Sequence, residues 1–146
     1  MGFSGTYRYD GTRWHELEGW SQAEHPGRWL AVVIFDSDLA EVRYQPAGPG
    51  TGSAFLGYTP RDYFGDEDAS APTDVPREAA GLAAWWADGD DAADTDGKAG
   101  EIEGFLAADD APHVHPKTDD ADLFVEIKAA RFLTALGLPL PPALAR

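Results

Sequence analysis

Residues 29–35 (WLAVVIF) form the longest uninterrupted apolar run in the chain, and turn-forming residues bound the run on both sides. Seven residues suit a strand, whereas a helix that crosses a bilayer needs about 20 apolar residues. A short apolar run between turns is typical of a strand that is buried on both faces of a sheet. We therefore predict a central strand over 29–35 and no membrane-spanning segment.

Other strands flank this run on both sides. Residues 39–44 (LAEVRY) alternate between apolar side chains on one face and charged side chains on the other, as a half-exposed antiparallel strand does. After a glycine-rich connection, residues 53–58 predict a third strand of the meander. Near the N-terminus, Asp10-Gly11 between aromatic-bearing segments predicts a two-residue hairpin turn, because both turn positions need a positive φ.

The first clear helical pattern follows residue 73. Residues 59–73 are broken by prolines and acids, so we predict a surface loop there with one helical turn around residues 60–64. A helix then begins at Thr73 or Asp74, with Pro76 in its first turn. Its apolar stripe consists of Val75, Ala79, Leu82, Ala83 and Trp86.

Two more helices are predicted toward the C-terminus. A short helix covers residues 101–107, after an acidic loop over 88–97. The last helix begins near residues 118–120, where Asp119, Asp120 and Asp122 would complement the helix dipole. It ends at Gly137 and is followed by an extended, proline-rich tail (LPLPPALAR).

Strands therefore come first in the chain and helices come after them. This segregation predicts an α+β fold, in which an antiparallel sheet (an N-terminal hairpin plus a meander) carries two main helices on one face. The length of 146 residues fits one domain. We expect a single domain over 1–146 with a C-terminal helical extension over 98–146.

The net charge of −15 lies in one stretch of the sequence. Residues 62–122 hold 18 acidic residues against three basic ones, whereas the rest of the chain has eight of each. Nucleic acid and anionic membranes would repel such a chain, so neither is an expected partner. A basic protein or a hard cation would be attracted.

Motifs for catalysis and cofactor binding are missing from the sequence. There is no cysteine, no Gly-x-Ser-x-Gly elbow, no P-loop and no Gly-x-Gly-x-x-Gly fingerprint, so we expect no cofactor. The N-terminus lacks the basic and apolar regions of a signal peptide, which predicts a cytoplasmic protein. These features favour a non-enzymatic binding protein over an enzyme.

The acidic loop after the first main helix is the predicted contact surface for a basic partner. Trp29 and Trp86 are assigned to the core, whereas Trp85 lies about 100° from Trp86 around the helix and is predicted at the core's edge, partly exposed. Tryptophan is enriched at interfaces, so Trp85 is a candidate anchor. The predicted partner-binding residues are Trp85, Asp88, Asp90, Asp91, Asp94 and Asp96.

Two metal-binding arrangements remain as alternatives. Asp94, Asp96 and Glu103 match three ligand positions of a calcium-binding EF-hand loop, although Ala92 occupies the first ligand position. His113 and His115 flank one residue, a spacing that suits two metal ligands of a metal-dependent hydrolase. A third alternative is a structural subunit of an oligomer, since the proline-rich tail and spare aromatic residues would allow one.

The middle of the chain also resembles a known family. Five short sequence segments follow one another over residues 29–88: WLAVVIFD, LAEVRY, Leu-Gly-Tyr, RDYFGDEDAS and Thr-Asp-Val-Pro-Arg-Glu. This layout resembles actinobacterial immunity proteins of bacterial polymorphic toxin systems. The resemblance implies a cytoplasmic inhibitor that binds a cognate toxin, and it implies no catalytic residues. An acidic inhibitor would suit a toxin that is basic because it acts on nucleic acid.

Overall fold

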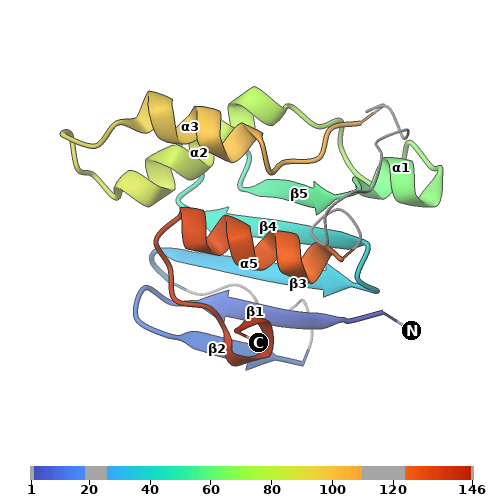
Figure 1. Ribbon diagram of the computed structural model, residues 1–146. Coiled ribbons are helices and arrows are strands. Elements are labelled where there is room, and N and C mark those ends of the chain that lie inside the picture. The colour runs from blue at the N-terminus through green and yellow to red at the C-terminus, as the bar shows by residue number, and fades with distance from the viewer. Residues whose placement is uncertain (1, 19–25, 110–123, 146) are drawn as a thin grey trace.

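The computed structural model describes residues 2–18, 26–109 and 124–145, and five strands in them form one antiparallel sheet (Figure 1). The sheet order is β2-β1-β3-β4-β5. The strands are β1 (Gly5–Tyr9), β2 (Trp14–Leu17), β3 (Trp29–Phe35), β4 (Leu39–Gln45) and β5 (Ser53–Gly57). The predicted hairpin, meander and central strand are therefore confirmed.

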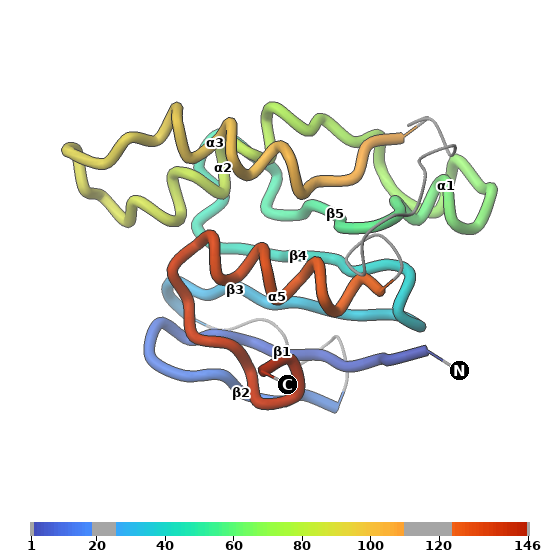
Figure 2. The backbone as a smooth tube through the Cα atoms, in the orientation of Figure 1, coloured from blue at the N-terminus to red at the C-terminus, as the bar shows by residue number. Residues whose placement is uncertain are grey.

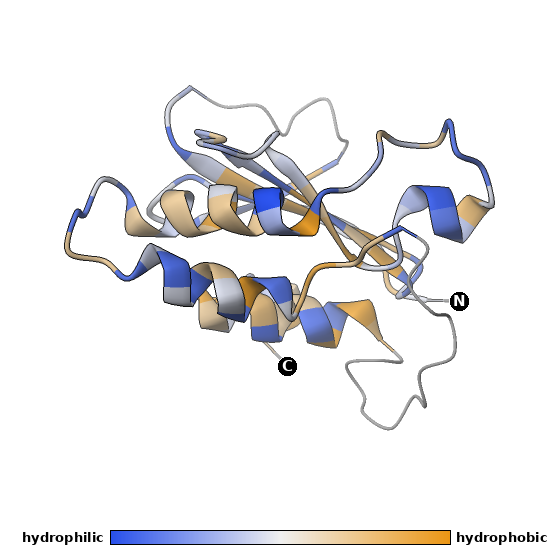
Figure 3. Ribbon diagram, turned by 90° about the horizontal axis from the view of Figure 1, so that it is seen from above, coloured by the Kyte–Doolittle hydropathy of each residue, from blue (hydrophilic) through white to orange (hydrophobic). Residues whose placement is uncertain are grey.

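The helices of the described chain are α1 (Pro60–Phe64), α2 (Val75–Ala87), α3 (Thr95–Glu103) and α5 (Val125–Ala135), with a 3₁₀ turn η2 (Pro142–Leu144). Helices α2, α3 and α5 lie on one face of the sheet (Figure 3). This arrangement confirms the predicted α+β fold. None of the helices in the described residues is long and apolar enough to cross a membrane.

The main core lies between the helices and the sheet face that they cover. Its largest fully buried side chains include Leu30, Val32, Val42, Leu56, Leu82, Trp85, Ile102, Phe132 and Leu133. On the opposite face, a smaller cluster joins Trp29, Ala31 and Leu17. Strand β3 is thus buried on both faces only at its start, because Phe35 at its end is 47% exposed.

The N-terminal hairpin has a wider loop than Asp10-Gly11 predicted. Tyr9 pairs with Trp14, so residues 10–13 form the loop. Asp10 accepts hydrogen bonds from the backbone N–H groups of Thr12 and Arg13, and its other oxygen lies 2.7 Å from His15 Nε2. The bonds with His15, Arg13 and Thr12 hold the pKa of Asp10 well below its usual range and close the loop without a two-residue turn.

Two predicted helix boundaries are wrong. Helix α3 covers Thr95–Glu103 rather than 101–107, because the Asp94 carboxylate caps it by accepting a hydrogen bond from Gly97 N–H. Leu106 has left the helix and forms a β-bridge with Leu56. Helix α5 begins at Val125, after extended backbone at Phe124, and not at residues 118–120. Asp119, Asp120 and Asp122 lie outside the described residues.

The C-terminal tail folds back onto the first hairpin instead of extending away from the domain. Gly137, with φ +73°, ends α5 as predicted. Pro141 and Leu144 are then buried, and Leu144 belongs to the main core. Trp14 Nε1 donates a hydrogen bond of 2.7 Å to the carbonyl oxygen of Pro139. The tail is therefore part of the folded domain (Figure 2).

Candidate partner-binding surface

Residues 88–96, here called the acidic connection, join α2 to the first turn of α3. They project from one end of the molecule, where the tube runs from green-yellow into yellow (Figure 2). The exposed carboxylates of this segment are Asp88, Asp90, Asp91, Asp94 and Asp96. The structure therefore gathers the predicted acidic contact residues on one protruding turn.

Three of these aspartates also shape the acidic connection. Asp88 has a left-handed backbone and closes α2 through an N–H bond to the Ala84 carbonyl oxygen. Asp90 accepts a hydrogen bond from Ala92 N–H, and Asp94 caps α3. Within the described residues, no hydrogen bond or ion pair engages the side chains of Asp91 and Asp96. Removing the charge of those two carboxylates therefore breaks no hydrogen bond or ion pair in the described residues.

Few cations approach the acidic connection in the described part of the chain. Arg28 Nε lies 3.4 Å from Asp88 Oδ1, and Arg28 also donates to the carbonyl oxygen of Trp85. Lys98 in α3 is directed elsewhere, to Glu101 and to the Ala135 carbonyl oxygen. The turn thus keeps a strong negative charge.

Trp85 is not the exposed anchor that the sequence predicted. Its side chain is only 1% exposed, and its indole N–H donates to the carbonyl oxygens of Trp29 and Gln45 at 3.0 and 3.1 Å. The Arg28 guanidinium lies 3.7 Å from the ring centroid and covers it. Trp86 is instead the partly buried residue, with Lys98 Nζ 4.8 Å from its ring. Ala79, Leu82 and Ala83 of the predicted stripe are fully buried, but the buried face of α2 continues to Trp85 and not to Trp86.

The calcium-site alternative fails on geometry. The Asp94 carboxylate already accepts the capping hydrogen bond of α3. Asp96 lies in the first turn of this helix, and Glu103 lies at its other end. A nine-residue helix separates its ends by about 12 Å at 1.5 Å per residue, too far for ligands of one ion. No group of three potential metal ligands occurs among the described residues. His113 and His115 lie outside those residues.

A buried carboxylate that the sequence did not reveal ties α2 to the β4–β5 connection. Glu78 is 6% exposed and accepts hydrogen bonds from the Tyr44 hydroxyl, at 2.6 Å, and from Thr51 N–H and Oγ1. Burial, followed by the bond to Glu78, raises the pKa of Tyr44. Gly81, a glycine inside α2, is the available sequence signal of this close packing. A Cβ at position 81 would overlap the Tyr44 hydroxyl.

A cavity of about 370 Å³ adjoins Glu78, at the low end of the size range for ligand sites. Glu41, Ser53, Thr73 and Arg77 are among its lining residues. Both Glu78 oxygens already accept hydrogen bonds from Tyr44 or Thr51, and Glu41 accepts one from Ser53. These bonds tie Glu78 on α2 to β4 and to the β4–β5 connection, and they tie β4 to β5.

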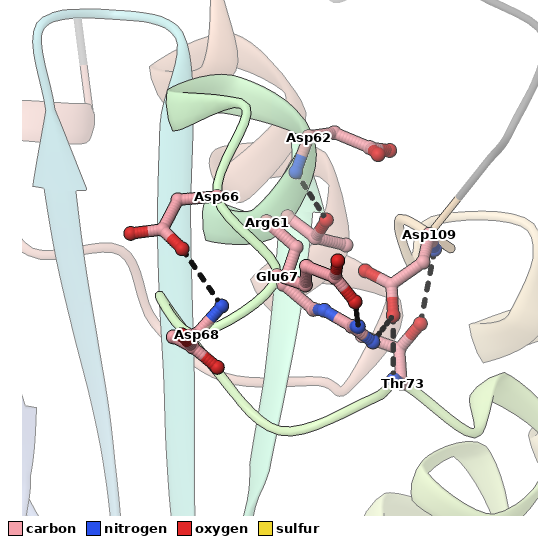
Figure 4. Close-up of polar contacts among 8 residues, drawn as sticks. Arg61, Asp62, Asp66, Glu67, Asp68, Thr73 and Asp109 are labelled. Carbon is pink, nitrogen blue, oxygen red and sulfur yellow. Dashed lines mark hydrogen bonds and ion pairs between the residues drawn. The ribbon is translucent and has the colours of Figure 1, made fainter.

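A second polar cluster fixes α1 and the loop after it (Figure 4). Arg61 Nη1 lies 3.3 Å from Asp109 Oδ2, and the same oxygen accepts a hydrogen bond from Thr73 N–H. Burial by itself would raise the pKa of Asp109, but hydrogen bonds from Thr73 and Thr59 and the charge of Arg61 outweigh it and lower that pKa. This cluster joins residues that are far apart in the sequence.

Comparison of the chain with family models, with curated proteins and with solved structures finds no match.

Proposed function

We propose that this chain is a non-enzymatic protein that binds a basic protein partner through the acidic connection. The observation that carries the proposal is the exposure of all five carboxylates of residues 88–96 on one protruding turn, with Arg28 as their close cation. Opposite charge on a partner would speed association and select against acidic competitors.

The concrete form of the proposal is an immunity protein that acts in the cytoplasm and masks the basic surface of a toxin. The resemblance over residues 29–88 supports this form, and so does the acidity of residues 62–122. Nothing in the proposal needs a cofactor.

The test neutralises two exposed carboxylates that accept no hydrogen bond in the described residues. Asp91→Asn with Asp96→Asn changes the net charge by two units, and Glu16→Lys on β2 changes it equally at a remote exposed site. A basic partner purified from the native host by its association with this chain is then measured by surface plasmon resonance at two salt concentrations.

The double variant should associate at least about threefold more slowly than wild type at low salt, since charge acts mainly on the association rate. Glu16→Lys should have a much smaller effect. Equal effects of the two variants would mean that the acidic connection is not the contact surface.

A further inference from the structure

A group of aromatic rings lies exposed at the end of the sheet opposite the acidic connection. The large apolar side chains that are exposed in the described residues are Phe35 at 47%, Phe64 at 57% and Phe124 at 46%. Two of them pack with tyrosines into a cluster of Phe35, Tyr58, Tyr63 and Phe64, here called the ring patch. Ring centroids in the ring patch lie 5.1 to 6.2 Å apart. An exposed group of this kind is a usual mark of an interaction site.

The ring patch is exposed because of where its residues lie in the fold. Phe35 is the last residue of β3 and points to the sheet face opposite the helical core, as Trp29 and Ala31 do. Helix α1 brings Tyr63 and Phe64 against Phe35, yet α1 itself has no buried residue. The rings therefore cover one another only in part.

Polar contacts hold the ring patch in place. Thr59 is fully buried and caps α1, while the Tyr63 hydroxyl donates a hydrogen bond of 3.0 Å to Asp38. Arg61 anchors the same helix to Asp109 (Figure 4). A surface that is already ordered loses less conformational entropy when it binds, so its contacts contribute more to affinity.

Carboxylates lie close to the ring patch or follow its residues in the sequence. Asp36 and Asp38 lie in the turn after Phe35, and Asp62 and Asp66 lie in and just after α1. In Figure 4, the Asp66 carboxylate points away from the contacts of Arg61 with Glu67 and Asp109. The cation on α1, Arg61, is directed to Asp109 and Glu67. The rings thus lie in negatively charged surroundings.

The geometry points to the ring patch as an anchoring surface for a protein partner whose contact face combines arginine or lysine with apolar side chains. Aromatic faces attract cations, and fully desolvated aromatic residues carry most of the energy of many interfaces. A second copy of this chain fits poorly, because its own carboxylates would face those around the ring patch. This inference rests on the proposed basic partner but assigns it a second, distinct surface.

The two surfaces are far enough apart to be tested separately. Trp29 at the start of β3 bonds to Trp85 near the acidic connection, whereas Phe35 at its end belongs to the ring patch. Over the seven residues of β3 these ends are about 20 Å apart. Figure 1 shows α1 and the α2–α3 turn at opposite ends of the sheet. Substitutions at such a distance usually have additive effects.

The probe is a synthetic amphipathic peptide of arginine and leucine, and an oligolysine of equal charge serves as the charge-only control. Affinity is measured by calorimetry and the contact is located by ¹⁵N chemical-shift changes. One double variant, Phe35→Thr with Phe64→Ser, removes the exposed rings. A second double variant, Phe35→Tyr with Phe64→Tyr, keeps them as a control. The single variant Phe64→Ser replaces the first if that double variant folds poorly.

We expect the arginine–leucine peptide to shift resonances of residues 35 and 58–64, and the loss of both rings to weaken its binding at least about tenfold. The tyrosine pair should bind as wild type does, and oligolysine binding should not depend on the rings.

Unchanged peptide binding after removal of the rings would overturn the inference. If peptide binding is weakened only by Asp91→Asn with Asp96→Asn, the ring-patch inference is overturned but the proposed function stands. If neither peptide binds, the result counts against both the inference and the proposed function. A wild-type dimer in sedimentation that removal of the rings dissociates would assign the surface to a second copy instead. A large loss of stability with unchanged peptide binding would mean that the rings pack against another part of this chain.

Discussion

The two ends of the sheet present different kinds of acidic surface. The acidic connection carries five exposed carboxylates and buries its nearby tryptophan, Trp85, whereas the ring patch exposes Phe35 and Phe64 among its carboxylates. Exposed charge acts at a distance and is screened by salt, while desolvated rings act at contact and slow dissociation. The charge distribution of a sequence can therefore locate a surface of exposed carboxylates, but it does not reveal a surface of exposed aromatic rings.

Replacement of Trp85 by alanine should have the largest effect on stability. The side chain is fully buried and makes two indole hydrogen bonds, so we expect a loss of about 3–5 kcal/mol in the free energy of unfolding. Urea denaturation followed by circular dichroism measures it. Phe64→Ala is the matched control at the other end, with an expected loss below about 1 kcal/mol. If the two variants lose similar free energies of unfolding, the buried Trp85 and the exposed Phe64 do not differ in their contribution to stability.

Replacement of Asp109 by asparagine should have an intermediate effect, at the end that carries the ring patch. The change deprives Arg61 of its carboxylate, so we expect a loss of about 1–3 kcal/mol at pH 7 and a loosened α1. Because the pKa of Asp109 is lowered in the folded state, its contribution is present above its unfolded pKa of about 3.9 and is lost as the pH falls below that value.

The difference in stability between wild type and Asp109→Asn should therefore shrink in urea titrations as the pH falls below about 4 and through the lowered pKa of Asp109. Asp68→Asn, an exposed change in the loop after α1, is the control for the loss of one carboxylate outside the contacts of Arg61 and Asp109. A pH-independent difference for Asp109→Asn would mean that the carboxylate charge does not stabilise the cluster.

The smallest effect is expected from calcium at the acidic connection. Asp94 is occupied as a helix cap and Glu103 lies at the far end of α3, so calcium should leave the melting temperature unchanged relative to EDTA. A bound ion at 100 times its Kd would add about 2.7 kcal/mol of stability. A rise of several degrees in differential scanning fluorimetry would show that the acidic connection binds an ion after all.

The strands and the start of α2 could be predicted because their signals are local. Alternation along β4, the apolar run of β3 and the Asp74 cap with Pro76 are visible in short windows. Trp85 and Trp86 are adjacent and equally apolar, so the sequence pattern does not decide which of them is buried. That depends on Arg28 and on the Trp29 carbonyl oxygen, which reach α2 only in the folded chain. The same limit hid Glu78, whose partners lie on β4 and in the β4–β5 connection.

Boundaries failed where weak helix formers or extended backbone interrupted the pattern. Gly97 and Gly100 lower the helix propensity of α3, and a single capping bond from Asp94 offsets part of that loss. The ring patch was missed because exposure of Phe35 and Phe64 depends on which sheet face α1 covers, and no local pattern encodes that choice.

The bond between Trp14 and Pro139 has a consequence for how the chain folds during synthesis. It joins positions 125 residues apart, and Leu144 and Phe132 complete the same core from the late part of the sequence. A growing chain on the ribosome exposes the first hairpin and the sheet face long before these residues are made. Because contacts of such sequence separation slow folding, the domain should acquire its native state only when synthesis has passed residue 144.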